Sequence, residues 1–135
     1  MYGRIANLMA WRAGLMMAGC AEALAGEHLF PYAVYFGDRL QAIPNARDLV
    51  QVYRSIHAAL TTLGAQQLEA RVVALGLPRA GRYRVWVDWW AELGDGSRRL
   101  VAQTVEYMRE TEDGSRSEMT ECTGWAPAAA AIAAR

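Results

Sequence analysis

The first part of the chain carries hydrophobic residues at the spacing of one helix face. Intervals of three and four residues between positions 4 and 19 predict an amphipathic helix with a charged residue in its apolar stripe. The stripe comprises Ile5, Leu8, Met9, Arg12, Leu15, Met16 and Gly19. Gly19 is expected to end this helix, and residues 21–25 are expected to begin a short second one.

After residue 31 the pattern changes to two short β-rich runs, 32–36 and 39–43, on either side of a Gly-Asp turn. This arrangement predicts a small β-hairpin. A capping arrangement at Asn45 then begins a third predicted helix, which ends at Gly64. The buried stripe of that helix comprises Leu49, Val52, Tyr53, Ile56, Leu60 and Leu63.

The remainder of the chain has the pattern of four β-strands separated by three Gly-containing turns. The strand-like runs are 67–77, 82–93, 98–111 and 115–123. Together the elements predict an α+β fold in which three N-terminal helices close a cone-shaped, curved four-stranded antiparallel sheet with a small hairpin beside it. We expect a single domain over residues 1–135, ending in an alanine-rich tail at residues 126–135.

The strand register follows if Asp95-Gly96 and Asp113-Gly114 are two-residue hairpin turns, because alternate side chains then share a face. The more apolar face should lie under the helices. Its predicted members are Leu68, Ala70, Val72, Ala74, Tyr83, Val85, Val87, Trp89, Ala102, Thr104, Glu106, Met108, Met119, Glu121 and Thr123. The sequence thus predicts a cup lined mostly by apolar side chains.

Within this cup the register places Glu106 opposite Glu121, with Cβ atoms within about 5.5 Å of each other. Arg12, which points inward from the first helix, is the natural partner of the two carboxylates. One interpretation is a buried ionic network that serves only the fold. The other is a polar floor in which a carboxyl group transfers a proton while Arg12 binds an anionic or carbonyl oxygen.

Other side chains are candidates for contact with a small molecule in the cup. They are Tyr35, His57, Trp89, Thr104, Met108, Met119 and Thr123. His57 also fits a position on the flank of the third helix, without a role in binding. His28 stands near a helix end, where a histidine interacts with the helix dipole.

The opposite face of the sheet carries charged residues, which suggests solvent, but also an aromatic group. This group forms more apolar surface than is usual for a solvent-exposed face, which predicts a homodimer interface. It consists of Trp86, Trp90, Val105 and Tyr107. Scattered surface aromatic residues are the alternative.

The amino-acid composition excludes several classes of partner and of catalytic mechanism. The 14 basic residues are all arginine and balance 14 acidic residues, so no net field attracts nucleic acid or an anionic membrane. Without lysine, a Schiff base or a P-loop lysine is excluded. Cys20 and Cys122 lack metal-ligand spacing, so we expect free thiols in the cytoplasm, and neither a metal nor a cofactor.

Two features of the N-terminal region bear on membranes. Residues 15–20 are loosely similar to a bacterial lipoprotein cleavage site, but Arg12 interrupts the preceding apolar run and the segment has helical periodicity. No apolar run approaches the ~20 residues that span a bilayer. We therefore expect no membrane association.

The order of elements resembles the nuclear-transport-factor-2-like superfamily, which includes ketosteroid isomerase, scytalone dehydratase and polyketide cyclases. Local similarity lies in Gly19-Cys20-Ala21-Glu22-Ala23-Leu24 and in Val105-Glu106-Tyr107-Met108-Arg109, followed by a glycine turn and Glu118-Met119. The resemblance implies a cystatin-like roll and a small bacterial protein of unassigned function.

By the same resemblance, Glu106 falls where ketosteroid isomerases carry an aspartic acid that donates to the substrate oxyanion. Arg12 falls near their tyrosine donor. The general base of these isomerases has no counterpart, since Gly37 and Asp38 occupy a turn, and the histidine–aspartate pair of scytalone dehydratase has none either.

Two functions remain open at this stage. The preferred one is a homodimeric module that binds a small apolar or carbonyl-containing molecule. The alternative is a lyase or isomerase acting on a small carbonyl compound, with Glu106 and Glu121 as acid and base and Arg12 as oxyanion stabiliser. A cavity near ~300 Å³ would favour ligand chemistry, and a filled cup a structural role.

Overall fold

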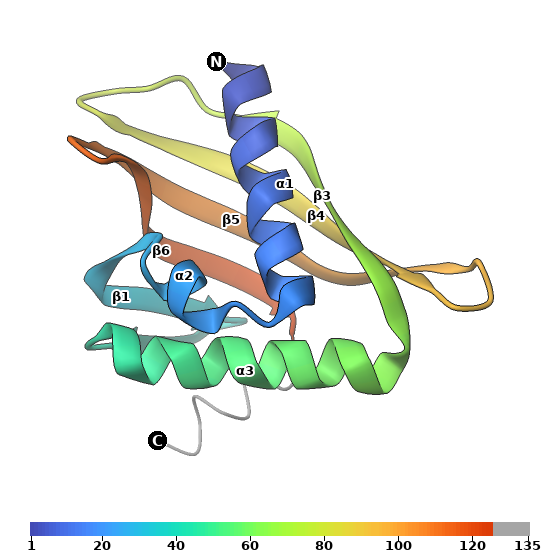
Figure 1. Cartoon of the computed structure of the whole chain (residues 1–135). Helices are drawn as coiled ribbons and strands as arrows, with labels where there is room; N and C mark the ends of the chain where they lie inside the picture. The colour runs from blue at the N-terminus through green and yellow to red at the C-terminus, as the bar shows by residue number, and fades with distance from the viewer. Residues whose placement is uncertain (126–135) are drawn as a thin grey trace.

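The computed structural model describes residues 1–125 and contains helices and strands in the predicted order (Figure 1). The predicted alanine-rich tail at residues 126–135 lies outside the described residues. The elements are α1 (Tyr2–Ala18), α2 (Ala21–Ala25), β1 (His28–Phe36), β2 (Arg39–Ile43), α3 (Ala46–Leu63), β3 (Ala65–Leu75), β4 (Arg82–Leu93), β5 (Arg98–Thr111) and β6 (Gly114–Gly124).

The helix ends follow from local sequence. The side chain of Asn45 accepts a hydrogen bond from the Asp48 backbone N–H at 2.9 Å and so caps the N-terminus of α3. Gly19 and Gly64 end α1 and α3 in the left-handed region, at φ 74° and 80°, where glycine is favoured. The predicted ends at these two glycines are confirmed.

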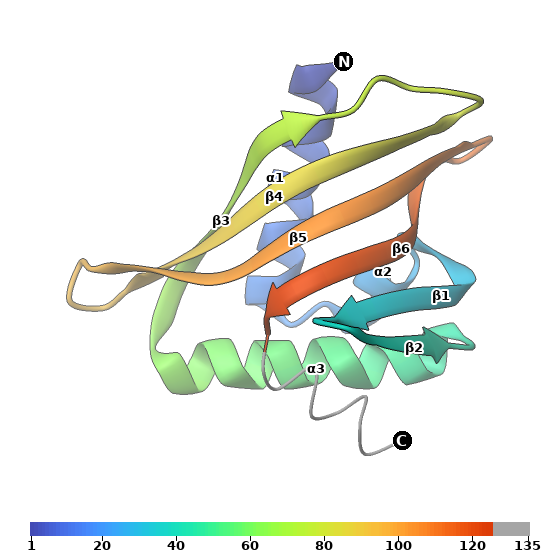
Figure 2. The ribbon, with the colours of Figure 1, turned by 180° about the vertical axis from the view of Figure 1, so that it is seen from behind.

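The strands form one open sheet of six strands in the order β2-β1-β6-β5-β4-β3 (Figure 2). The predicted four-stranded sheet with a separate hairpin is therefore incorrect, because β1 pairs with β6 in parallel and joins the hairpin to the sheet. Pairing between strands so distant in the chain leaves no local sequence signal. The result is a mixed sheet within an α+β fold.

Helices α1, α2 and α3 lie on one face of the sheet, and the opposite face carries no helix among the described residues (Figures 1 and 2). Helix α1 buries the apolar stripe that its sequence predicts, including Ile5, Met9 and Met16. On β4, the alternation from Tyr83 to Trp89 points the predicted residues into the core. This face is the wall of the predicted cup.

The register between β5 and β6 differs from the prediction. Met108 pairs with Ser117, but Tyr107 pairs with Met119, so Glu118 is an extra residue in a β-bulge. An extra residue in one strand sends the later side chains to the opposite face. The inward orientation predicted for three residues is therefore wrong: Met119, Glu121 and Thr123.

Beyond the bulge, Thr120 and Cys122 face the helices instead. Glu106 is paired with Thr120, and Glu121 is paired with Val105. The predicted pair of facing carboxylates does not exist in the structure.

Candidate functional site

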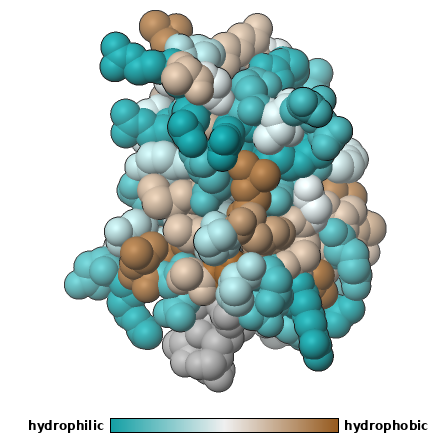
Figure 3. Space-filling view, turned by 90° about the vertical axis from the view of Figure 1, so that its left-hand side faces the viewer, coloured by the Kyte–Doolittle hydropathy of each residue, from teal (hydrophilic) through white to brown (hydrophobic). Residues whose placement is uncertain are grey.

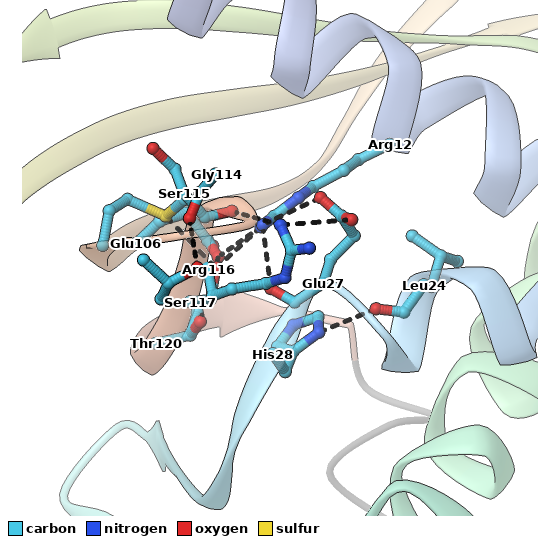
Figure 4. Close-up of polar contacts among 12 residues, drawn as sticks. Arg12, Leu24, Glu27, His28, Glu106, Gly114, Ser115, Arg116, Ser117 and Thr120 are labelled. Carbon is cyan, nitrogen blue, oxygen red and sulfur yellow. Dashed lines mark hydrogen bonds and ion pairs between the residues drawn. The ribbon is translucent and has the colours of Figure 1, made fainter.

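Arg12 is the centre of a buried polar group on the helix-covered side of the sheet (Figure 4). We call this group the Arg12 cluster. It comprises Arg12, Glu27, Glu106, Ser117 and Thr120. The helical spacing that buries Met9 and Met16 also turns the Arg12 side chain inward, where it is 2% exposed.

The guanidinium of Arg12 makes directional contacts with both of its terminal nitrogens. Nη1 donates to Ser117 Oγ at 2.7 Å, and Nη2 donates to the Glu27 carbonyl oxygen at 3.1 Å. The carboxylates of Glu27 and Glu106 lie 3.7 and 3.8 Å away. The Nε–H group is buried and has no hydrogen-bond partner among the described residues. One donor of this buried cation therefore has its hydrogen-bonding capacity unused among the described residues.

Glu27 is a member of the cluster that sequence reasoning missed. It lies between α2 and β1, where its carbonyl oxygen also accepts from the Ser117 backbone N–H at 2.9 Å. Its carboxylate lies 3.8 Å from Arg116, so two arginines face the two buried glutamates. The position of Glu27 follows from the β1–β6 pairing, which no short-range pattern indicates.

Glu106 connects the cluster to a chain of hydroxyl groups. Its Oε1 accepts from Thr120 Oγ1 at 3.0 Å and from Ser117 Oγ at 3.4 Å. Thr120 in turn is hydrogen-bonded to the hydroxyl of Tyr32 on β1. Burial and the nearby Glu106 carboxylate raise the pKa of Tyr32 well above its usual value, so its hydroxyl keeps its proton.

Glu121, the second predicted catalytic carboxylate, lies on the opposite face. It is exposed and accepts a hydrogen bond from the Tyr107 hydroxyl. The bulge at Glu118 puts it there, so Glu121 and Arg12 are on different sides of the sheet.

A cavity of about 50 Å³ opens beside the Arg12 cluster. Most of its wall is apolar, and its polar residues include three members of the Arg12 cluster. The lining residues are Arg12, Met16, Tyr32, Val34, Phe36, Leu49, Val52, Tyr53, Ile56, Trp89, Thr104, Glu106, Thr120, Cys122 and Trp125. The volume suits a few water molecules and is well below the ~300 Å³ at which typical ligand sites begin.

Trp125 is a buried aromatic residue of the cavity wall. Its ring lies 6.1 Å from that of Trp89, and its side chain is 8% exposed. The chain reaches this position through Gly124, at φ 90°, where a Cβ atom would clash with the Val101 carbonyl oxygen. Trp125 itself has φ 47°, an uncommon and strained value for a bulky residue. The small cavity is thus partly a result of where Trp125 lies.

His28 and Tyr53 form a second polar contact next to the cavity. His28 Nδ1 lies 2.8 Å from the Leu24 carbonyl oxygen, and Nε2 lies 3.0 Å from the Tyr53 hydroxyl. Burial, together with the charge of Arg12, lowers the pKa of His28 to about 3, so the imidazole is neutral. His28 lies near a helix end, as expected, and its ring also contacts Tyr32.

Two of the predicted ligand contacts, Trp89 and Thr104, lie on the cavity wall, where the indole Nε1–H donates to Thr104 Oγ1 at 2.9 Å. The others do not line the cavity. Tyr35, Met119 and Thr123 belong to the other face of the sheet or its edge, and Met108 lies beneath Ser117.

His57 also lies away from the cavity. Its Nδ1 is 3.0 Å from the Met16 carbonyl oxygen, and its ring packs against Gly19, so it fixes the end of α1 on α3. The alternative that placed His57 on the flank of the third helix describes its position.

No group of three or more metal-binding side chains occurs among residues 1–125. Burial, with Glu106 nearby, raises the pKa of the Cys122 thiol to about 12, which keeps this wall residue protonated. Within the same residues, no helix is long and apolar enough to cross a membrane.

The aromatic residues of the opposite face are partly covered by arginines of the same chain. Arg84 lies 5.5 Å from the ring of Trp86, and Arg98 lies 5.4 Å from that of Trp90. A hollow of about 340 Å³ beside Trp86 and Val105 is open to solvent. Figure 3 shows another side of the molecule, where hydrophobic residues form small patches separated by hydrophilic ones.

No protein-family model and no curated protein matches the sequence. Solved structures do match. One is a nuclear-transport-factor-2-like protein of unknown function from Shewanella oneidensis, with a TM-score of 0.68, 10% identity and coverage of 88% of this chain and 95% of that chain. Another, from Novosphingobium aromaticivorans, is a nuclear-transport-factor-2-like protein with a cystatin-like fold; it has a TM-score of 0.63, 18% identity and coverage of 96% and 84%.

A third match is a candidate dehydratase of the nuclear-transport-factor-2-like family from Streptomyces avermitilis. Its TM-score is 0.59 at 14% identity, over 89% of this chain and 91% of that chain. Identities this low establish a shared fold and carry no activity from one protein to another.

Proposed function

The chain has the nuclear-transport-factor-2-like fold, and we propose that it uses the helix-covered face of its sheet to bind a small, mostly apolar molecule. The single observation that supports this most directly is the buried Nε–H of Arg12, a residue of the cavity wall, which has no acceptor among the described residues. A buried donor without a partner costs free energy, and a ligand oxygen would supply the missing acceptor.

The rest of the wall agrees with such a ligand. Leu49, Val52 and Ile56 from α3, together with Trp89, offer an apolar surface, and the polar wall residues include Arg12, Glu106 and Thr120 of the Arg12 cluster. An apolar pocket with a few convergent polar groups is the usual form of a small-molecule site. The ligand expected here carries one oxygen on an apolar body.

The cavity volume of about 50 Å³ requires that the site open when the ligand enters. Trp125 is the wall residue best suited to move, because its backbone adopts φ 47° and its N–H donates only a long bond of 3.3 Å, to Val101. Displacing this side chain would add the space that it occupies. We therefore place Trp125 as the movable part of the wall.

A thermal-shift screen with small apolar alcohols, ketones and aromatic fragments tests the proposal on wild type and on Trp125→Ala. A ligand that binds only the folded state raises the melting temperature, by an amount corresponding to about 2.7 kcal/mol when its concentration is 100 times Kd. The shift should be larger in Trp125→Ala, in which the cavity is already open.

Trp11→Ala is the matched control, because Trp11 is half-exposed on α1 and does not line the cavity. It should give the same ligand shifts as wild type. If no compound stabilises wild type or Trp125→Ala, the cup serves the fold alone and the proposal is wrong.

A second candidate function, a lyase or isomerase, is supported by the position of one carboxylate. The contacts that hold Glu106 within the Arg12 cluster fall on Oε1, and Oε2 takes part in none of them. Because Glu106 also lines the cavity, we assign to its carboxylate, in this version, the exchange of a proton with a bound carbonyl compound. Glu121 plays no part in this version, since it is on the other face.

Hydrogen–deuterium exchange next to the carbonyl of small ketones in D₂O tests this activity. Glu106→Gln should slow the exchange by a factor of about 10²–10⁴ if Glu106 is the proton-transfer group. Equal exchange rates with wild type and Glu106→Gln would exclude that role.

We also propose that the chain forms a homodimer through Trp86, Trp90, Val105 and Tyr107. All four are half-buried on the face that carries no helix, and the indole Nε1–H of Trp90 is buried without a partner among residues 1–125. A second copy packed on this face would cover the apolar surface that Arg84 and Arg98 leave open.

A further inference from the structure

The hydrogen-bond directions around the cavity restrict the ligand further. Two tyrosines line the cavity: the hydroxyl of Tyr32 contacts Thr120 of the Arg12 cluster, and the hydroxyl of Tyr53 contacts His28. A phenol has one proton to donate and can also accept. A tyrosine hydroxyl whose proton is already donated to another residue can only accept a hydrogen bond from a ligand.

The proton of Tyr53 is directed to His28. The Leu24 carbonyl oxygen can only accept, so His28 Nδ1, 2.8 Å away, carries the ring hydrogen. The imidazole is neutral, since burial and the charge of Arg12 lower its pKa to about 3. Nε2 is therefore an acceptor, and the Tyr53 hydroxyl donates to it at 3.0 Å.

The proton of Tyr32 is directed to Thr120. Glu106 faces the Arg12 guanidinium at 3.8 Å, and as a carboxylate it can only accept. Thr120 Oγ1 lies 3.0 Å from Glu106 Oε1 and donates its single proton there. The hydrogen bond between Tyr32 and Thr120 must then run from the phenol to the threonine.

Both tyrosine oxygens therefore have only lone pairs left for a ligand, and the Nε–H of Arg12, another residue of the cavity wall, is a buried donor without a partner among the described residues. A hydroxyl group satisfies both, because it can donate to a tyrosine and accept from Arg12. Resting on the proposed binding function, we infer that the ligand is an uncharged alcohol or phenol on an apolar body. A ketone or ether would leave the tyrosine lone pairs unpaired, and an ammonium group would bring a second positive charge next to buried Arg12.

Matched fragments test this inference. Phenol, toluene and fluorobenzene have similar shapes, but only phenol carries a polar hydrogen. They are titrated into ¹⁵N-labelled full-length wild type and Trp125→Ala, with the Trp89 indole N–H signal as the reporter, since this group donates to Thr104 on the cavity wall. Phenol should bind about tenfold more tightly than toluene or fluorobenzene, as expected for one buried hydrogen bond.

Removing an acceptor should remove the preference. In Tyr53→Phe the ratio of the phenol and toluene affinities should fall several-fold. Tyr32→Phe gives the same test if the loss of the His28 contact prevents Tyr53→Phe from folding.

The outcomes separate the two proposals. Equal affinities for the three fragments, with the Trp89 signal shifting in each case, would overturn the hydroxyl inference and leave the binding function standing. Tighter binding of fluorobenzene than of phenol would overturn it too. If none of the fragments shifts the Trp89 signal in either protein, the binding function fails and the inference fails with it.

Discussion

The two faces of the sheet hold charged residues in opposite ways. On the helix-covered face, one arginine, Arg12, is buried with two carboxylates and hydroxyl partners. On the open face, Arg71 and Arg98 share Glu69 and lie against Trp90 while remaining exposed. Removing one partner of Arg12 leaves a buried charge without a counter-charge. The exposed arginines can replace a lost partner with water.

This contrast predicts very different costs for removing an arginine from each face. Arg12→Met should lower the free energy of unfolding by about 3–5 kcal/mol, because buried Glu106 and Glu27 lose the cation between them. Arg98→Met should cost less than about 1 kcal/mol. Urea denaturation measures both. Similar losses in the two variants would contradict the contrast.

The second expected effect is a pH dependence confined to the buried side. The pKa of His28 is lowered from 6.5 to about 3 in the folded state, so between these values the unfolded chain binds more protons. Stability due to His28 is therefore complete above about pH 6.5 and is lost as the pH falls toward 3. The slope approaches about 1.4 kcal/mol per pH unit in mid-window.

Urea denaturation of wild type and His28→Gln between pH 4 and pH 8 measures this effect. The slope should be smaller in His28→Gln, whereas His57→Gln should retain it. An unchanged slope in His28→Gln would show that His28 is not the group responsible.

A smaller effect on stability is expected from deleting Glu118, the extra residue of the β-bulge in β6. Deleting Glu118 removes the bulge but keeps Tyr107 paired with Met119 and Ser117 paired with Met108. Among the described residues, the side-chain contact that is lost is the exposed ion pair with Arg82, so unfolding should be easier by about 1 kcal/mol or less. Deleting Val87, which is buried in β4, should instead prevent folding; a folded Val87 deletion would contradict this account.

The smallest effect on the fold itself is expected from the open face. Replacing Trp86 and Trp90 with glutamate should leave the monomer folded and convert a dimer to monomers in gel filtration. The double substitution Arg84→Gln and Arg98→Gln is the control, because it changes the net charge near the same rings by the same amount. If wild type elutes as a monomer, or if the tryptophan variant elutes as the dimer does, the proposed interface is wrong.

The sequence predicted what depends on local periodicity. The alternation in β4 and β5 placed Trp89, Thr104 and Glu106 on the inner face, and the stripe of α1 turned Arg12 toward them. These patterns are regular, so counting by two or by three and four gives the right face.

The parts that the sequence did not predict depend on long-range pairing or on an irregular residue. Glu118 looks like any other residue of an alternating run, yet it reverses the face of Glu121. Glu27 and Tyr32 reach the Arg12 cluster because β1 lies next to β6. The position of Trp125 follows a left-handed backbone at Gly124, where close approach to Val101 leaves no room for a Cβ atom.

The parallel pairing of β1 with β6 also bears on how the protein reaches its native state. It joins residues that lie more than eighty positions apart, such as Phe36 and Cys122, whereas β3 to β6 pair with their neighbours in the chain. Contacts that close such a long loop form slowly. The Arg12 cluster has residues on both sides of the β1–β6 pairing. Its ion pairs should therefore form only in the last stage of folding, after the antiparallel hairpins have formed.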